Sequence, residues 1–167
     1  MEVELLFYKC LKMGFRKVFN LILILVFVFG LTNIDVLFSI DSSQIVDRQN
    51  YLQHVINAEN FFFRALNYGF PLFFIFEPLY FFIVYLITLF QFSPEITIKI
   101  LIFISAFFTI YTLYNKSKIS LFWIIVISLT PFFLANYIMT LRQGLAFCFF
   151  LLGHFYFKDW RKYFFIL

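Results

Sequence analysis

The sequence predicts an all-α polytopic membrane protein, and its composition carries that prediction. Hydrophobic residues make up 63% of the chain and charged residues only 13%, with a mean hydropathy of +0.93. Soluble domains carry about 25% charged residues, roughly twice as many. The charges also fall in short clusters between long apolar runs, as in loops that join membrane-spanning helices. We expect about 4–5 transmembrane helices, an interfacial amphipathic helix and a re-entrant segment.

The net charge of +4 indicates basic loops on the cytoplasmic side of a membrane rather than an anionic partner. Neither a basic patch nor a recognition module for nucleic acid occurs in the sequence, so we expect no nucleic-acid partner. The two cysteines, Cys10 and Cys148, are far apart and belong to no metal-like or redox-like pair. We therefore expect no disulfide framework, no metal and no cofactor.

The N-terminal 17 residues form a basic flank that we expect in the cytoplasm. Residues 18–40 follow as an apolar run with few interruptions. A signal peptide begins in the same way, but this run is long and no small-residue cleavage site follows it. We expect an uncleaved first transmembrane helix, and we expect residues 18–167 to form a single transmembrane domain.

Polar and charged side chains collect over one long stretch, residues 41–78, which we expect to form an extracytoplasmic loop. Within it, apolar and polar residues alternate at helical spacing, which predicts an amphipathic helix over residues 52–66 in the membrane interface. His54 falls on the polar face, where a solvated surface position is expected. The apolar face comprises Leu52, Val55, Ile56, Phe62, Phe63 and Leu66, and the polar face Gln53, His54, Asn57, Asn60, Arg64 and Asn67.

Two later runs, residues 96–114 and 119–141, are long enough to cross a membrane, the second with Pro131 as a tolerated kink. Residues 143–157 form another apolar run. Residues 163–167 resemble the first turn of a further span, so we expect the chain to be an incomplete product.

Residues 72–92 have two interpretations. About 14 clean apolar residues follow Glu77-Pro78, which is short for a span and suits a re-entrant or interfacial segment. If this segment does not cross, the N-terminus and the loops 116–118 and 158–162 all face the cytoplasm, with nine of the 13 Lys and Arg residues. If it crosses, both later basic loops turn outward. The positive-inside rule therefore favours the non-crossing topology, which places Arg142 outside with Asp47 and Glu77.

These three residues are the sharpest candidates for chemistry. Arg142 lies between two apolar runs, where it either reaches lipid headgroups or binds phosphate or diphosphate oxygens with its planar fork. Asp47 belongs to a compact polar cluster that is otherwise an ordinary solvated loop. Glu77 is costly in hydrocarbon and must face water, a partner or a cavity. Together they suit glycosyl transfer from a lipid diphosphate, with a carboxylate taking the acceptor proton and the arginine stabilising the departing diphosphate.

Three short motifs resemble elements of a known family. They are Asp47-Arg48-Gln49-Asn50-Tyr51, Glu77-Pro78-Leu79-Tyr80 and Arg142-Gln143-Gly144-Leu145-Ala146. Their order and approximate spacing are similar to the EpsG family of bacterial polysaccharide-biosynthesis membrane proteins, which is related to Wzy-type O-antigen and capsule polymerases. The resemblance covers residues 47–167. Family members continue through several more spans with a further His-containing element that does not occur in this sequence.

The resemblance implies polymerisation of undecaprenyl-diphosphate-linked oligosaccharide repeat units for an exopolysaccharide, O-antigen or capsule. It places the reaction on the outer side of the bacterial cytoplasmic membrane, with no required metal. The partners implied are the lipid-linked oligosaccharide, membrane lipids and other polysaccharide-assembly proteins. The alternative is a non-catalytic membrane subunit or a flippase fragment. The roles expected are catalytic for Asp47, Glu77 and Arg142, and substrate binding for Arg48, Tyr51, Tyr80 and Gln143.

Overall fold

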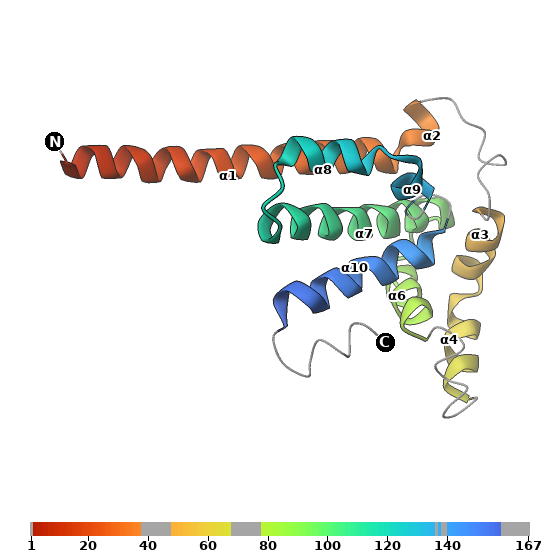
Figure 1. The fold of residues 1–167 in the computed structure, drawn as a ribbon. Coiled ribbons are helices and arrows are strands. Elements are labelled where there is room, and N and C mark those ends of the chain that lie inside the picture. The colour runs from red at the N-terminus through yellow and green to blue at the C-terminus, as the bar shows by residue number, and fades with distance from the viewer. Residues whose placement is uncertain (1, 38–47, 68–77, 136, 138–139, 158–167) are drawn as a thin grey trace.

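The computed structural model describes residues 2–37, 48–67, 78–135, 137 and 140–157. Every regular element in these ranges is helical (Figure 1). The predicted all-α class is therefore confirmed.

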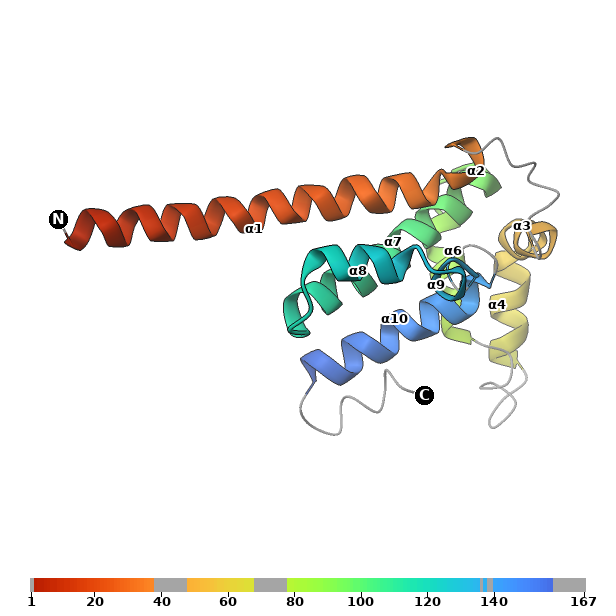
Figure 2. The ribbon, with the colours of Figure 1, turned by 45° about the horizontal axis from the view of Figure 1, so that its top comes forward.

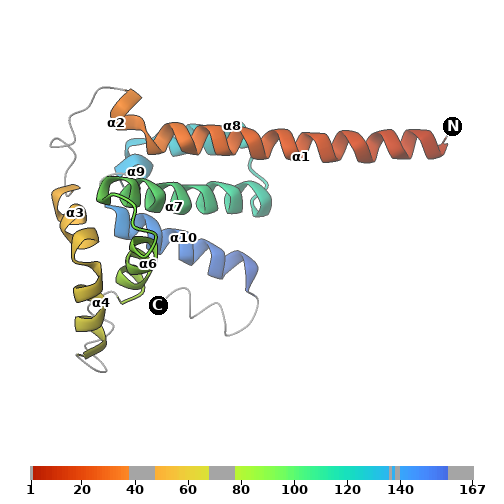
Figure 3. The same cartoon turned by 180° about the vertical axis from the view of Figure 1, so that it is seen from behind.

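Helix α7 (Pro94–Lys116) is the axis of the fold, because α1 (Glu2–Thr32) and α10 (Leu141–Tyr156) both pack along it. Figures 1 and 3 show α1 running antiparallel to α7 on one side of it, while α10 lies on the other side. The first turns of α1 project beyond the other helices (Figures 1 and 2). A short helix, α2 (Ile34–Leu37), follows α1 after a turn.

The ends of α7 follow directly from its sequence. Ser93 caps the N-terminus by accepting a hydrogen bond from the Ile96 amide at 3.4 Å, and Pro94 occupies the first turn, where its missing N–H costs nothing. Glu95 in the first turn and Lys116 in the last turn both oppose the helix dipole. The helix has 23 residues. At 1.5 Å per residue it is about 35 Å long, enough to cross a bilayer core.

Among the described residues, two helices are long and apolar enough to cross a membrane, Gly14–Thr32 and Pro94–Lys116. This is fewer than the 4–5 expected. Helix α10 has 16 residues and α6 (Pro78–Thr88) has 11. Part of the doubtful segment 72–92 lies outside the described ranges, as does all of 163–167.

The span expected over residues 119–141 is not one helix, and Pro131 is the reason. The segment divides into α8 (Leu121–Ser128) and α9 (Pro131–Leu134), with Thr130 at the N-cap position of the second piece. Proline lacks the N–H that would continue the ladder, and its ring clashes with the preceding turn. Pro131 therefore starts a new helix instead of kinking an existing one.

The predicted amphipathic segment is helical but consists of two pieces, α3 (Arg48–Ile56) and α4 (Ala58–Asn67). Asn57 occupies the junction, where its Nδ2 donates to the Gln53 carbonyl at 3.1 Å. The backbone N–H of Asn57 donates to the same carbonyl at 3.0 Å, so i to i−4 hydrogen bonding continues across the junction. Figures 1 and 3 show α3, α4 and α6 lying across the end of the bundle at which α7 begins.

An apolar core lies between α1, α7, α8 and α9. Two hydrogen bonds join helices beside this core: the buried hydroxyls of Thr109 and Tyr137 are 2.6 Å apart, and Asn20 Nδ2 donates to the partly buried Tyr114 hydroxyl at 2.6 Å. Hydrogen bonds of this kind join helices where apolar packing alone has little directional preference. The core members are Ile24, Val28, Leu31, Ala106, Ile110, Ile124, Phe133 and Tyr137.

The turn between α6 and α7 generates a stability prediction, because Gln91 has a φ of 58°. The left-handed conformation costs a non-glycine residue about 1–2 kcal/mol. We expect Gln91→Gly to retain or raise the melting temperature in detergent and Gln91→Val to lower it. Equal melting temperatures for the two variants would contradict this account of the turn.

Candidate functional site at the first turns of helix α7

Four charged side chains from three helices meet beside the first turns of α7. Nη2 of Arg48 donates to Oε2 of Glu95 and lies 3.3 Å from Oδ2 of Asp35. Nζ of Lys99 lies 3.4 Å from Oδ1 of Asp35 and donates to Oδ1 of Asn33 at 3.1 Å. We call these four charged side chains, together with Asn33, the ion cluster. It holds two cations and two carboxylates, so its formal charge is zero.

Burial makes these contacts important for the fold. The side chains of Arg48 and Asp35 are only 10% and 13% exposed. A buried charge that loses its partner destabilises a protein by about 3–5 kcal/mol. The ion cluster therefore holds together the corner after α1, the start of α3 and the first turn of α7.

Sequence reasoning missed most of this cluster. It assigned Arg48 to substrate binding and gave Asp35, Glu95 and Lys99 no role. One signal was present: Asp35 interrupts the apolar run 18–40, and a carboxylate at that depth requires a cationic or polar partner. The identity of the partner depends on tertiary structure, because Lys99 is distant in the sequence.

An aromatic cluster begins one turn along α3 from Arg48. The rings of Tyr51 and Tyr80 have centroids 6.5 Å apart and meet edge to face. The His54 ring meets Tyr51, Tyr80 and Phe81 edge-on, at 5.9, 6.0 and 5.3 Å. Phe61 stacks on Phe81 at 5.1 Å. These geometries are the favourable ones for aromatic pairs.

The expectation of a solvated His54 is therefore wrong. Its ring is partly buried among these aromatic side chains, and its Nδ1 is inaccessible to solvent. The helical periodicity assigned His54 to the polar face, whereas its ring packs beside that of Tyr51 against residues of α6. Periodicity could not show that α6 would pack against this ring.

One apolar core contains residues from all three segments that carry the predicted motifs. Tyr51 from the first, Tyr80 from the second and Leu145 from the third are 4%, 6% and 6% exposed and belong to one apolar cluster. We call this the motif core. Its other members are Val55, Ala58, Phe81, Val84, Ile98, Leu101, Ile102 and Leu141. Segments far apart in the sequence therefore meet at the first turns of α7.

The predicted site residues fall into three groups. Asp47 and Glu77 lie outside the described residues. Arg142 and Gln143 are exposed on the first turn of α10, where Oε1 of Gln143 accepts a hydrogen bond from the Thr140 hydroxyl at 3.2 Å. The buried group consists of Arg48, Tyr51 and Tyr80.

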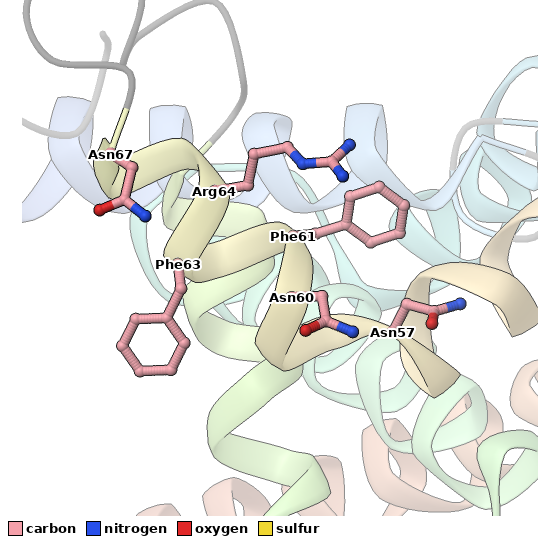
Figure 4. A pocket seen from close by; sticks show the side chains of 6 residues that line it. All are labelled: Asn57, Asn60, Phe61, Phe63, Arg64 and Asn67. Atoms are coloured by element: carbon pink, nitrogen blue, oxygen red, sulfur yellow. The ribbon is translucent and has the colours of Figure 1, made fainter.

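A groove of about 560 Å³ runs along α4 (Figure 4). It is lined by Asn57, Asn60, Phe61, Phe63, Arg64 and Asn67. Within the described ranges, no group of three or more His, Cys, Asp or Glu side chains is placed to hold a metal ion. The groove is thus lined by amides, a guanidinium and aromatic rings.

Comparison of the chain with protein families, with curated proteins and with solved structures found no match.

The different burial of the site residues predicts different effects on stability. We expect Tyr51→Ala to destabilise the protein by about 3 kcal/mol, because removing a buried aromatic side chain leaves a cavity in the motif core. Arg142→Ala removes an exposed side chain and should change stability by less than about 1 kcal/mol. Thermal unfolding in detergent measures both. A smaller loss for Tyr51→Ala than for Arg142→Ala would contradict the assignment.

Proposed function

We propose that this chain is a multi-pass protein of the bacterial cytoplasmic membrane that polymerises oligosaccharide repeat units carried on undecaprenyl diphosphate. The observation that supports this most is the convergence of the three motif-bearing segments on the motif core. The three motifs are far apart in the sequence, so their positions in the chain do not by themselves bring them together. A shared site for one reaction is the simplest reason for bringing them together.

The proposed site divides into a support and a reactive edge. Arg48, Tyr51 and Tyr80 are buried, so in this proposal they position the surrounding backbone. Contact between these tyrosines and a sugar is limited to the ring edges that the substrate can reach. Arg142 and Gln143 are exposed at the start of α10 and form the reactive edge. Asp47 and Glu77 remain the proposed carboxylates.

The proposed reaction is a displacement at an anomeric carbon. A carboxylate of Asp47 or Glu77 accepts the proton of the acceptor hydroxyl, and the hydroxyl oxygen bonds to the anomeric carbon of the donor. The bond between that carbon and the diphosphate oxygen breaks, and the diphosphate leaves with the electron pair. Arg142 stabilises the charge that develops on it through paired N–H donors.

The proposed topology follows the charges at the ends of the helices. The N-terminus of α1 and Lys116 at the end of α7 lie toward the same end of the fold, which we assign to the cytoplasm (Figure 1). The opposite end carries the ion cluster and the motif core and is assigned to the outer side. Helices α3, α4 and α6 lie across that end, as interfacial or re-entrant segments would.

A second candidate function is a non-catalytic membrane subunit or a flippase fragment in the same assembly pathway. One observation favours it: Arg48 is paired with Asp35 and Glu95 inside the chain, as a structural arginine would be. Binding of lipid-linked oligosaccharide by the purified protein separates a substrate-handling protein from a purely structural one.

The main test replaces Arg142 in cells that produce the polymer. We expect Arg142→Ala to shorten or abolish polymer chains, and Arg142→Lys to restore them only in part, because lysine keeps the charge but loses the paired donors. Gel profiles of the polysaccharide measure chain length. Asn115→Ala, an exposed amide near the end of α7 and outside all three motifs, is the matched control. Chains of undiminished length in both Arg142 variants would exclude the proposed role.

The topology has its own test. A reporter tag fused after Ser117, in the basic loop that follows α7, should report the cytoplasm. A tag signal from the outer side would mean that the chain crosses the membrane once more before α7. Arg142 would then face the cytoplasm and leave the proposed site.

A further inference from the structure

The groove along α4 has a lining of unusual chemistry for a membrane protein. Its polar groups are three asparagine amides and one guanidinium, and its apolar groups are two phenylalanine rings. Among the described residues that line it, none is a carboxylate and Arg64 alone is charged. The residues lie at intervals of three and four, which places them along one side of the helix.

Figure 4 shows how the side chains are distributed. The guanidinium of Arg64 and the ring of Phe61 lie on one flank, and the ring of Phe63 points to the other flank. Asn57 and Asn60 extend from the N-terminal end of α4, and Asn67 from its C-terminal end. The amides thus mark both ends of the groove.

Internal hydrogen bonds orient one of these amides. Nδ2 of Asn57 donates to the Gln53 carbonyl at 3.1 Å and to Oε1 of Gln53 at 3.4 Å. Both of its amide hydrogens can therefore bond to Gln53 of α3, which fixes the orientation of this amide. Asn60 and Asn67 are exposed and offer both donors and acceptors.

This combination matches the needs of a sugar hydroxyl. Each hydroxyl is both a donor and an acceptor, as is each amide, so one asparagine can bind two neighbouring hydroxyls. The Phe63 side chain is 46% exposed and offers an apolar surface to the C–H face of a sugar ring. A phosphate-binding site would instead gather cations. A groove that binds the apolar face of a partner helix would be lined mainly by hydrophobic side chains.

We propose that the α4 groove binds uncharged sugar residues of a glycan chain. This inference rests on the proposed function, because the glycan would be the saccharide part of the same lipid-linked substrate or its growing product. The groove holds sugar and takes no part in the bond-breaking step.

Phe61 connects the groove to the motif core. Its side chain lines the groove and also stacks on Phe81, which belongs to that core. A glycan in the groove would therefore lie next to the place where the three motif segments meet. The glycan chain would continue from the groove toward the proposed reactive edge in one direction and away from it in the other.

The experiment uses the full chain in nanodiscs of phosphatidylcholine, applied to an array of uncharged bacterial oligosaccharides. We expect at least one uncharged glycan to bind. In the variant that carries both Asn60→Ala and Asn67→Ala, affinity should fall by about tenfold or more, because each lost amide removes at least one hydrogen bond. The variant Asn60→Asp, which keeps the shape and loses the donors, should weaken binding by a smaller factor. Asn115→Ala, outside the groove and the motifs, should bind like the wild type.

Two results would overturn the inference. One is the absence of binding to any uncharged glycan by the wild type, or equal binding by the wild type and the double alanine variant. The other is binding that appears only with phosphatidylglycerol vesicles and disappears in Arg64→Ala, since the groove would then be a site for lipid headgroups. Unchanged helical circular dichroism in the variants establishes that they are folded.

The same variants separate this inference from the proposed function. If the asparagine variants lose glycan binding while Arg142→Ala leaves polymer length unchanged, the groove is a glycan site and the polymerase proposal fails. If Arg142→Ala abolishes the polymer while the asparagine variants bind and polymerise normally, the polymerase proposal holds and the groove inference fails.

Discussion

The pairing of Arg48 with Asp35 and Glu95 is the constraint on which the arrangement of this end of the fold depends. Arg48 and Asp35 are only 10% and 13% exposed, so each needs charged partners to avoid the cost of an unpaired buried charge. Because these groups belong to α2, α3 and α7, their contacts join the start of α3 to the corner after α1 and to the first turn of α7. The aromatic cluster then follows one turn further along α3, and α6 packs against it.

This constraint separates the supporting residues from the exposed ones. The ion cluster and the motif core are buried and act as a scaffold, whereas Arg142, Gln143 and the amides of α4 remain at the surface. A scaffold of this kind can hold exposed polar groups in fixed positions at the edge of a membrane. Functional groups on rigid helices keep their geometry better than groups on loops.

The sequence predicted the helical class and the position of the amphipathic segment, because composition and helical periodicity are local properties. It predicted one helix over residues 52–66 and one over 119–141, whereas the structure divides both, at Asn57 and at Pro131. The division at Pro131 depends on how strongly the surroundings can hold a proline within a helix. The ion cluster and the packing of α6 on His54 are contacts between distant segments, which periodicity does not report. Of the candidate site, the sequence assigned Arg48, Tyr51 and Tyr80 to substrate binding and did not reveal that they are buried.

The most direct test of this account is a double-mutant cycle between Asp35 and Arg48, read from thermal unfolding of the full chain in detergent. Asp35→Asn and Arg48→Gln should each destabilise the protein, and the double variant should be about 2 kcal/mol more stable than the sum of the two losses predicts. Asn20→Ala combined with Arg48→Gln is the control pair, because Asn20 bonds Tyr114 on the other core and its effect should add. Losses that simply add for Asp35 and Arg48 would show that the two side chains do not depend on each other, and the scaffold described here would not hold.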